Sequence, residues 1–544
     1  MKKKKSNFIV QGSILAMAGV LSRIIGIVRR FPMEHIIGDK GNGFYSTAYE
    51  VYAIMLIISC YSLPLAVSKV VASKISKRQY QSAERAFRCA MVFAVVSGGI
   101  TFLICELFGD FLATDVMLEP MSAMALKVLG PALLIVSVMG VFRGYFQGLG
   151  TMVPTAVSQI LEQIFVLIGS VAGAYFLFSY GSKVGELLHN EDYAPAFGAA
   201  GASIGPVLGS VVGLLFLFFV FAVYKKANKK QSINVTSEKA DSYQQIFRLI
   251  ILTILPVLLS TTVYNISNVL DIRIYNSVMI QKGLEDVKAY NWGVYSGKYR
   301  VIVNVPIALA NAMCSSIVPV LTRLMVREEY TQVRQKIEQG MRFTMLVAIP
   351  SAVGLTVLAR PIISMLFRGE VDMAVDMLHI GSISVVFYTM STLTNGVLQG
   401  INRMKIPVRN AAISLVIHIA FLYVTLQMGM GINAVVYANI LFAVIVCILN
   451  AMAIRKYLRY RQELIRTFVI PGIAALIMGV VIGLINMLLS KTIGNVLTVL
   501  VGITLGVIVY FLALILLKGV DENDLRSMPG GSKVLVIAKK FRLM

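Results

Sequence analysis

The chain has 544 residues, of which 57% are hydrophobic and only 14% are charged, and its mean hydropathy is +0.78. This composition excludes an ordinary water-soluble domain and is typical of a protein with many membrane-spanning segments. A formal net charge of +23 would suggest nucleic-acid binding in a soluble protein. Here the positions of Lys and Arg along the chain indicate membrane topology instead.

Apolar runs of 18 or more residues recur along almost the whole chain, and each can cross about 30 Å of hydrocarbon as a helix. We therefore expect an all-α polytopic membrane protein with fourteen transmembrane helices. The division between the eleventh and twelfth rests on a very short turn at 428–433. The predicted spans are 8–30, 46–70, 86–108, 122–146, 155–180, 197–224, 246–275, 294–322, 341–366, 374–400, 407–429, 431–454, 466–489 and 493–517.

Basic residues gather in alternate loops, from Lys2–Lys5 through Lys225–Lys230 to the tail at 518–542. The intervening loops hold acids such as Glu186 and Asp192, with few basic residues. By the positive-inside rule, both termini are predicted to be cytoplasmic, and an even number of spans gives the same result. The first apolar run is too long for a signal peptide and lacks a small-residue cleavage site, so no cleavable signal is predicted.

The chain repeats itself at a shift of about 250 residues (295 minus 45). Collinear matches across four segments indicate a duplication. The matched positions are Gly43 and Gly293, Tyr45 and Tyr295, Tyr49 and Tyr299, Tyr80 and Tyr330, Gly148 and Gly400, Pro154 and Pro407, and Arg23 and Arg273.

Each copy holds six predicted spans, so both copies enter the membrane in the same orientation. We expect two parallel six-helix lobes, 1–230 and 231–460, related by an axis along the membrane normal with the substrate path between them. Residues 461–544 then supply two extra transmembrane helices and a basic cytoplasmic tail. These extra helices either face lipid or extend the central cavity as a groove for a lipid tail.

Charged side chains inside the spans are the candidate site, because a charge at mid-bilayer costs about 3 kcal/mol or more unless it meets water or a partner. Arginine suits a pyrophosphate ligand, since its planar fork donates paired hydrogen bonds to phosphate oxygens. Arg29 and Arg30 could alternatively snorkel to the membrane border. The predicted substrate-binding residues are Arg23, Arg29, Arg30, Arg273, Lys298 and Arg300, with Glu50, Arg143 and Glu162 as secondary candidates.

An ion or coupling site is a further hypothesis for the seventh span. Asp271 shares a helix face with Asn268, and with Asn265 it offers the oxygens that hard cations prefer. Against a sodium site, the eleventh span contains no Asp or Glu. Asp271 and Arg273 could instead form a structural salt bridge between lobes. No cofactor, metal site or enzyme motif is predicted, and the five cysteines are interpreted as packing residues.

The chain resembles the MOP superfamily, and within it the MurJ-like lipid II flippases and their SpoVB and YtgP relatives. The resemblance covers the whole chain. It rests on the segment 21–29 (LSRIIGIVR), on Gly144–Gly148 followed by Pro154, on Gln399-Gly400 followed by Pro407, and on the segment 295–300 (YSGKYR) ahead of Pro306.

This resemblance implies a V-shaped pair of lobes around a cationic cavity that receives a polyprenyl-pyrophosphate sugar headgroup. Arg23 and Arg29 match essential first-span arginines of the family, and Arg300 matches an eighth-span arginine to within one position. The second span departs from the best-studied branch, because Glu50 is its only charge before Lys69. This favours the SpoVB–YtgP branch.

The function implied is that of a monomeric flippase in the bacterial cytoplasmic membrane, which moves an undecaprenyl-pyrophosphate-linked cell-wall precursor by alternating access. Lipid II and other lipid-linked glycans fit this interpretation equally, in vegetative growth or in sporulation. Neither nucleic acid nor catalysis is expected. The alternative is a MATE-type multidrug or cation antiporter, whose cavity should be acidic. A membrane glycosyltransferase would need a catalytic residue on a substantial outer loop.

Topology can be tested by cysteine labelling. A cysteine at Ser182 or Asn190 should react with an impermeant maleimide applied to intact cells, because both positions fall in a predicted outer loop. A cysteine at Asn228 should react only after the cells are permeabilised. The reverse pattern would contradict the orientation derived from the charge bias.

Overall fold

The structure is a computed structural model that describes residues 8–77, 79–228, 241–489 and 494–520. The four lysines near the N-terminus, most of the predicted linker after residue 228 and the basic tail lie outside the described residues. The described chain consists of helices and their connections, and it divides into two compact units, Met1–Gly293 and Val294–Met544.

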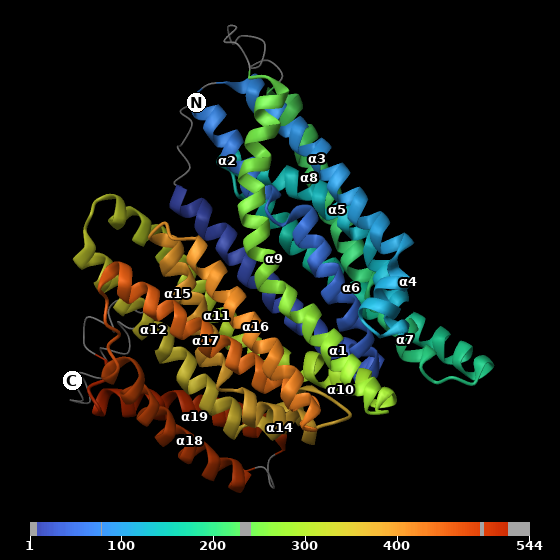
Figure 1. The fold of residues 1–544 in the computed structure, drawn as a ribbon, viewed down its shortest axis with the longest axis vertical. Helices are drawn as coiled ribbons and strands as arrows, with labels where there is room; N and C mark the ends of the chain where they lie inside the picture. Colours follow the sequence, from blue (N-terminus) through green and yellow to red (C-terminus); the bar gives the residue numbers. More distant parts are fainter. Residues whose placement is uncertain (1–7, 78, 229–240, 490–493, 521–544) are drawn as a thin grey trace. The chain divides into compact units, whose positions relative to one another are not determined.

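The first unit contains the helices drawn from blue to light green in Figure 1. Their bounds are α1 Phe8–Leu56, η1 Ile57–Tyr61, α2 Leu63–Ser76, α3 Tyr80–Leu107, α4 Gly109–Phe111, η2 Leu112–Val116, η3 Pro120–Ser122, α5 Ala123–Gly148, α6 Val153–Leu188, α7 Tyr193–Ala202, α8 Ile204–Asn228, α9 Tyr243–Gln281 and α10 Glu285–Val294.

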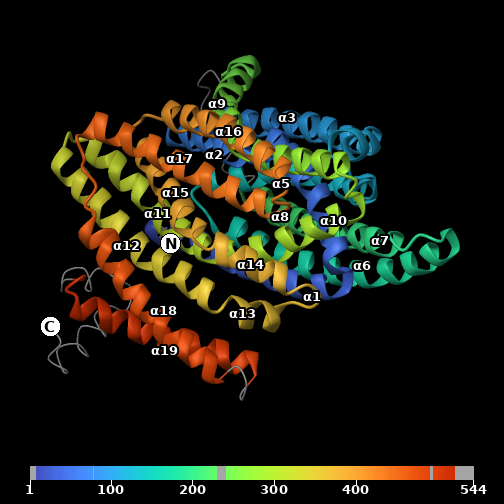
Figure 2. The ribbon, with the colours of Figure 1, turned by 60° about the horizontal axis from the view of Figure 1, so that its bottom comes forward.

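The second unit begins with a π-helical turn. Its elements are η4 Tyr295–Tyr299, α11 Arg300–Val326, α12 Tyr330–Val357, α13 Ala359–Leu366, α14 Asp372–Gly381, α15 Ser384–Gly400, α16 Lys405–Gln427, α17 Asn433–Leu458, η5 Ile465–Val469, α18 Ile470–Leu489 and α19 Asn495–Leu516. The last two helices, α18 and α19, lie side by side and pack on α12 and α13 (Figure 2).

Within the described residues, ten helices are long and apolar enough to cross a membrane, or eleven if the bent pair α14–α15 counts as one span. The multi-pass helical fold is therefore confirmed, whereas the number fourteen stays a prediction. Part of the difference arises because Met17–Ser76 counts as one candidate, although it overlaps two predicted spans, 8–30 and 46–70. Within α1 only Gly38 has non-helical backbone angles, with φ 66° and ψ −176°, a conformation that residues other than glycine rarely adopt.

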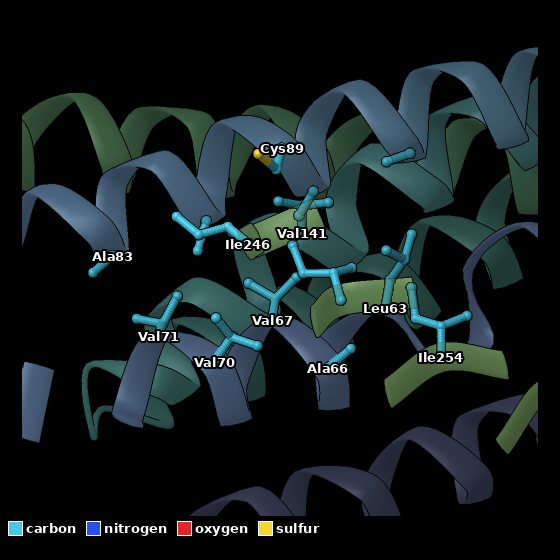
Figure 3. Close-up of a cluster of buried hydrophobic side chains, with 14 of the residues drawn as sticks. Leu63, Ala66, Val67, Val70, Val71, Ala83, Cys89, Val141, Ile246 and Ile254 are labelled. Atoms are coloured by element: carbon cyan, nitrogen blue, oxygen red, sulfur yellow. The ribbon is translucent and has the colours of Figure 1, made fainter. Parts of the chain in front are cut away.

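The core of the first unit is a cluster of small and β-branched side chains from α2, α3, α5 and α9 (Figure 3). Val67 of α2 and Ala86 of α3 are fully buried, and α9 contributes Ile246, Ile250 and Ile254. Lipid is as apolar as these side chains, so close van der Waals packing, and not exclusion from water, holds such helices together. The first helix after the linker thus packs into the first compact unit.

The start of α9 is anchored to this unit by polar contacts. Asp241 forms an ion pair with Lys74, its carbonyl accepts from Arg85 Nη1 at 2.7 Å, and its amide donates to Ser82 Oγ at 3.1 Å. Ser242 then caps α9 in a reciprocal capping box with Gln245. The predicted lobes, 1–230 and 231–460, are defined by sequence repetition and the compact units by contact. The lobe boundary and the separate 461–544 segment stay predictions.

The repeated glycine motif does the same packing in both units. Side-chain atoms added at Gly144 and Gly148 of α5 would each lie 2.7 Å from an atom of α2. At Gly396 and Gly400 of α15, the corresponding Cβ atoms would lie 3.1 Å from side chains of α11. Both motifs therefore let one helix approach another more closely than alanine allows, as small residues commonly do between membrane helices.

Candidate functional site

Three arginines of α1 belong to the predicted substrate-binding set, and they differ in exposure. Arg23 is exposed, Arg30 is half-buried, and Arg29 is buried with 8% of its surface exposed. The helix carries no acidic residue before Glu34. This part of α1 is therefore strongly cationic.

Arg29 is held by neutral partners. Its Nη1 donates to the Tyr45 hydroxyl and to Ser170 Oγ of α6, both at 3.1 Å, and its guanidinium carbon lies 5.8 Å from the centre of the Tyr45 ring. Ser170 in turn donates to the carbonyl of Ala202 at 2.8 Å. Because hydroxyl groups and a ring accept these contacts, none of them cancels the positive charge.

The contact between Arg29 and Tyr45 depends on the break at Gly38. Sixteen residues of straight helix would separate the two residues by about 24 Å. Since Gly38 ends one helical segment and starts the next, the chain turns back and the two side chains meet. The sequence identified Arg29 and the repeat identified Tyr45, but no sequence pattern connects the two.

A tyrosine pair occurs at the corresponding repeat positions of both units. The rings of Tyr45 and Tyr49 lie 5.8 Å apart with an interplanar angle of 25°, and those of Tyr295 and Tyr299 lie 5.6 Å apart at 31°. The polar partners differ, because the Tyr295 hydroxyl accepts from Asn439 Nδ2 at 3.3 Å. The aromatic pair is thus repeated, whereas its arginine partner is described only in the first unit.

Lys298 lies in η4 and is completely buried. Its Nζ donates to the carbonyl oxygens of Arg368 at 2.6 Å and Glu370 at 2.9 Å, which fixes the connection between α13 and α14. This placement gives Lys298 a structural role in the second unit, and its predicted contact with substrate stays a prediction. Arg300, the first residue of α11, is half-buried.

The residues predicted for an ion site lie along α9. Asn265 Nδ2 donates to the carbonyl of Thr261 at 2.8 Å, Asn268 is half-buried and Asp271 is buried. Among the residues that the structure describes, no three His, Cys, Asp or Glu side chains gather as metal ligands. The sodium site stays a prediction.

Arg273 belongs to a different set of contacts from Arg29. It is exposed, and its Nη1 donates to the carbonyls of residues 115 and 116 at 2.6 and 2.5 Å. Asn276 Nδ2 donates to the carbonyl of residue 117 at 2.8 Å, and Lys288 Nζ lies 3.1 Å from Glu119 Oε2. We refer to Arg273, Asn276, Lys288, Glu119 and the backbone of 115–117 as the loop cluster. Sequence reasoning missed Lys288 and Glu119, because neither the short polar helix α10 nor the connection before η3 gives a signal of burial.

Glu119 is the titratable group of the loop cluster whose environment is most unusual. Burial raises the pKa of its carboxyl above the ordinary value, although the charge of Lys288 acts to lower it. Lys40 and Asp192, which pair with each other, act on it weakly in opposite directions. Burial therefore costs this carboxylate more than its ion pair returns, as is common for buried pairs.

The loop cluster gives a pH-dependent prediction. Because the folded-state pKa of Glu119 is raised, its contribution to stability is most favourable at acidic pH and declines as pH rises through the raised pKa. Glu119→Gln removes the buried carboxylate but leaves the buried Lys288 ammonium without its anion, so it should lower the thermal midpoint at pH 7.5. Lys288→Met should lower stability by about 3 kcal/mol, because it leaves a buried carboxylate without its cation. Trp292, buried on α10 and the single tryptophan of the chain, reports the transition by fluorescence.

The double variant Glu119→Gln/Lys288→Met is the control, and it should recover most of the loss. The deficit of Lys288→Met alone should shrink at pH 5, where the carboxyl takes up a proton. An equal deficit at both pH values would contradict the interpretation.

Two family models match the chain. The one described as Polysaccharide biosynthesis protein matches residues 9–325, and the one described as MatE matches residues 299–424.

Two proteins of Bacillus subtilis (strain 168) match across most of their length. The chain is 24% identical over 489 residues to a protein named lipid II flippase MurJ, which covers 88% of each chain. It is 25% identical over 527 residues to stage V sporulation protein B, covering 96% of this chain and 98% of the relative.

A solved structure titled "Lipid II flippase MurJ, inward closed conformation" superposes with a TM-score of 0.64 at 16% identity. The match covers 92% of this chain and 97% of the other. At this identity the likeness concerns the fold.

Proposed function

Because the chain belongs to the polysaccharide biosynthesis protein family, we propose that it moves an undecaprenyl-pyrophosphate-linked cell-wall precursor across the bacterial cytoplasmic membrane. Lipid II or a related lipid-linked glycan is the substrate, and both termini are cytoplasmic. The names of its two relatives, one a lipid II flippase and the other a sporulation protein, support this class of substrate.

The observation that carries the proposal is the exposed Arg23 on an apolar helix. The residues around it are mostly apolar, and the sequence of the helix contains no acidic residue before Glu34. A charged side chain that stays exposed on a membrane-spanning helix often marks the path of a substrate or ion. A pyrophosphate can accept paired hydrogen bonds from such a guanidinium.

The three arginines of α1 would then have two different roles in binding the pyrophosphate. Arg23 and Arg30 attract and bind the pyrophosphate, while Arg29, held by Tyr45 and Ser170, contributes a fixed positive charge. Alternating access carries the headgroup between leaflets, and the substrate biases the two states only if it binds them differently. The inside-negative potential favours return of the empty cationic site to the cytoplasmic side, at up to about 2.3 kcal/mol per charge per 100 mV.

A MATE-type antiporter of drugs or cations is the second candidate, because the MatE model matches residues 299–424. Such a protein needs carboxylates to bind a cation. The arginines of α1 therefore favour the anionic substrate.

The proposed function is tested by rescue of cells depleted of their lipid II flippase, with the leaflet location of lipid II as the readout. Wild type should restore export. Arg23→Ala should reduce it tenfold to a hundredfold, because a charge-assisted bond contributes about 1.5–3 kcal/mol. Arg23→Lys keeps the charge without the fork and should be intermediate.

The matched control is Arg88→Ala, an exposed arginine of α3 that pairs with Glu84. This variant should rescue like wild type, and all variants should accumulate equally in the membrane. Full rescue by Arg23→Ala, or drug resistance without lipid II export, would contradict the proposal.

A further inference from the structure

A second charged site lies within the first unit, on α5 and α6. Arg143 Nη2 donates to Glu162 Oε2 at 2.7 Å, and its Nε donates to Ser158 Oγ at 3.0 Å. Both helices are long and apolar enough to span a membrane. At 1.5 Å per residue, Arg143 lies about 8 Å from the end of α5 and Glu162 about 14 Å from the start of α6. The pair therefore lies within two apolar helices, close to one end of α5.

This ion pair is only partly shielded, since 13% of the Arg143 side chain and 18% of the Glu162 side chain are exposed. Full enclosure of an ion pair would add a large desolvation cost, and this pair retains some access to its surroundings. Ionisable groups within membrane spans more often mark the path of a substrate or ion. The remaining exposure leaves the guanidinium within reach of an incoming anion.

The pair also borders the π-helical turn η1, which packs against α5. Cys60 of η1 lies within electrostatic range of both Arg143 and Glu162. Single π-helical turns occur frequently at functional sites. The charged pair and the π-helical turn are independent features, and they lie next to each other.

The contact between Arg143 and Glu162 does not use all the hydrogen-bond donors of the guanidinium. One Nη of Arg143 meets one oxygen of Glu162, so the contact is single and not the paired fork that guanidinium groups form with phosphate. The backbone of Glu162 is packed against α8, because a Cβ added at Gly209 would lie 2.6 Å from the Glu162 carbonyl oxygen. A phosphate that reaches Arg143 can therefore offer the guanidinium the paired contact that Glu162 does not make.

We propose that Glu162 is an internal counter-anion for Arg143, which the pyrophosphate of the substrate displaces so that Arg143 becomes a further substrate-binding residue. This inference rests on the proposed function, because it requires an anionic cargo. In the empty protein Glu162 neutralises a charge that would be costly within the membrane. During transport it competes with the cargo for Arg143. Transport needs binding that is firm enough for entry and weak enough for release.

The test measures binding and transport separately on the purified full-length protein. The binding probe is farnesyl pyrophosphate in detergent, and inorganic pyrophosphate as a competitor separates recognition of the lipid from recognition of the headgroup. Glu162→Gln should lower the dissociation constant about tenfold, because Arg143 loses its competitor. In liposomes the same variant should flip substrate more slowly, because release is delayed. Arg143→Gln should raise the dissociation constant about tenfold.

The exposed pair Glu84 and Arg88 on α3 supplies the matched control. Glu84→Gln removes the same carboxylate chemistry from an ion pair and should leave binding unchanged. Should Glu162→Gln fail to accumulate, Glu162→Asp keeps the charge but withdraws the carboxylate, so it should tighten binding to a smaller degree.

A merely structural pair behaves differently. Glu162→Gln would then not tighten binding, and the charge exchange Arg143→Glu/Glu162→Arg would restore wild-type binding and transport, which overturns the inference. Failure of the proposed function is distinguishable: wild type would not bind farnesyl pyrophosphate, and Arg23→Ala would change nothing. If wild type binds and Arg23→Ala weakens binding, but Glu162→Gln has no effect, only the inference about Glu162 is wrong.

Discussion

A charge inside an apolar helix bundle needs a partner, and this constraint accounts for the contacts of three cationic side chains in the structure. The chain meets it in three ways. Arg29 is satisfied by hydroxyl groups and a tyrosine ring, Lys298 by backbone carbonyls, and Arg143 by a carboxylate. The neutral partners leave the charge in place, whereas the carboxylate cancels it. A cationic site in a membrane can therefore be built from arginines with neutral partners, and its strength can be moderated where an acid competes.

Close helix packing is the second constraint, and the repeated glycines provide it. Because lipid offers no hydrophobic drive for association, contact area must come from close approach. The Gly144–Gly148 motif brings α5 against α2, and Gly396 and Gly400 bring α15 against α11. The polar pair on α5 and α6 lies next to this packing. Rigid neighbours thus hold Arg143 where a single contact with Glu162 is possible.

The sequence predicted the class of fold, the family and the arginine-rich first helix, because composition, motifs and the order of residues can be read without knowing which distant residues are in contact. It could not predict that Arg29 contacts Tyr45. The two residues meet because the backbone of a single residue, Gly38, is non-helical, and no sequence pattern shows this. It could not predict the partners of Lys298 either, because carbonyl groups belong to every residue and leave no pattern. The packing of α9 into the first unit also escaped it, since the duplication assigns that helix to the second copy. The number of spans stays a prediction, because hydropathy counts apolar runs, whereas the described residues hold ten or eleven helices long and apolar enough to cross a membrane.

The break at Gly38 also has a mechanical consequence. With helix on both sides and no flexible loop between, the two segments of α1 meet at a single articulated joint. The hydrogen bond from Arg29 to Tyr45 ties the two arms together across the joint, and the ring of Tyr45 stacks on Tyr49 within the second arm. Because no loop separates the two arms, a rotation of the first arm is transmitted to the second through Gly38. The segment that carries the arginines is therefore mechanically coupled to the segment that leads to η1 and Cys60.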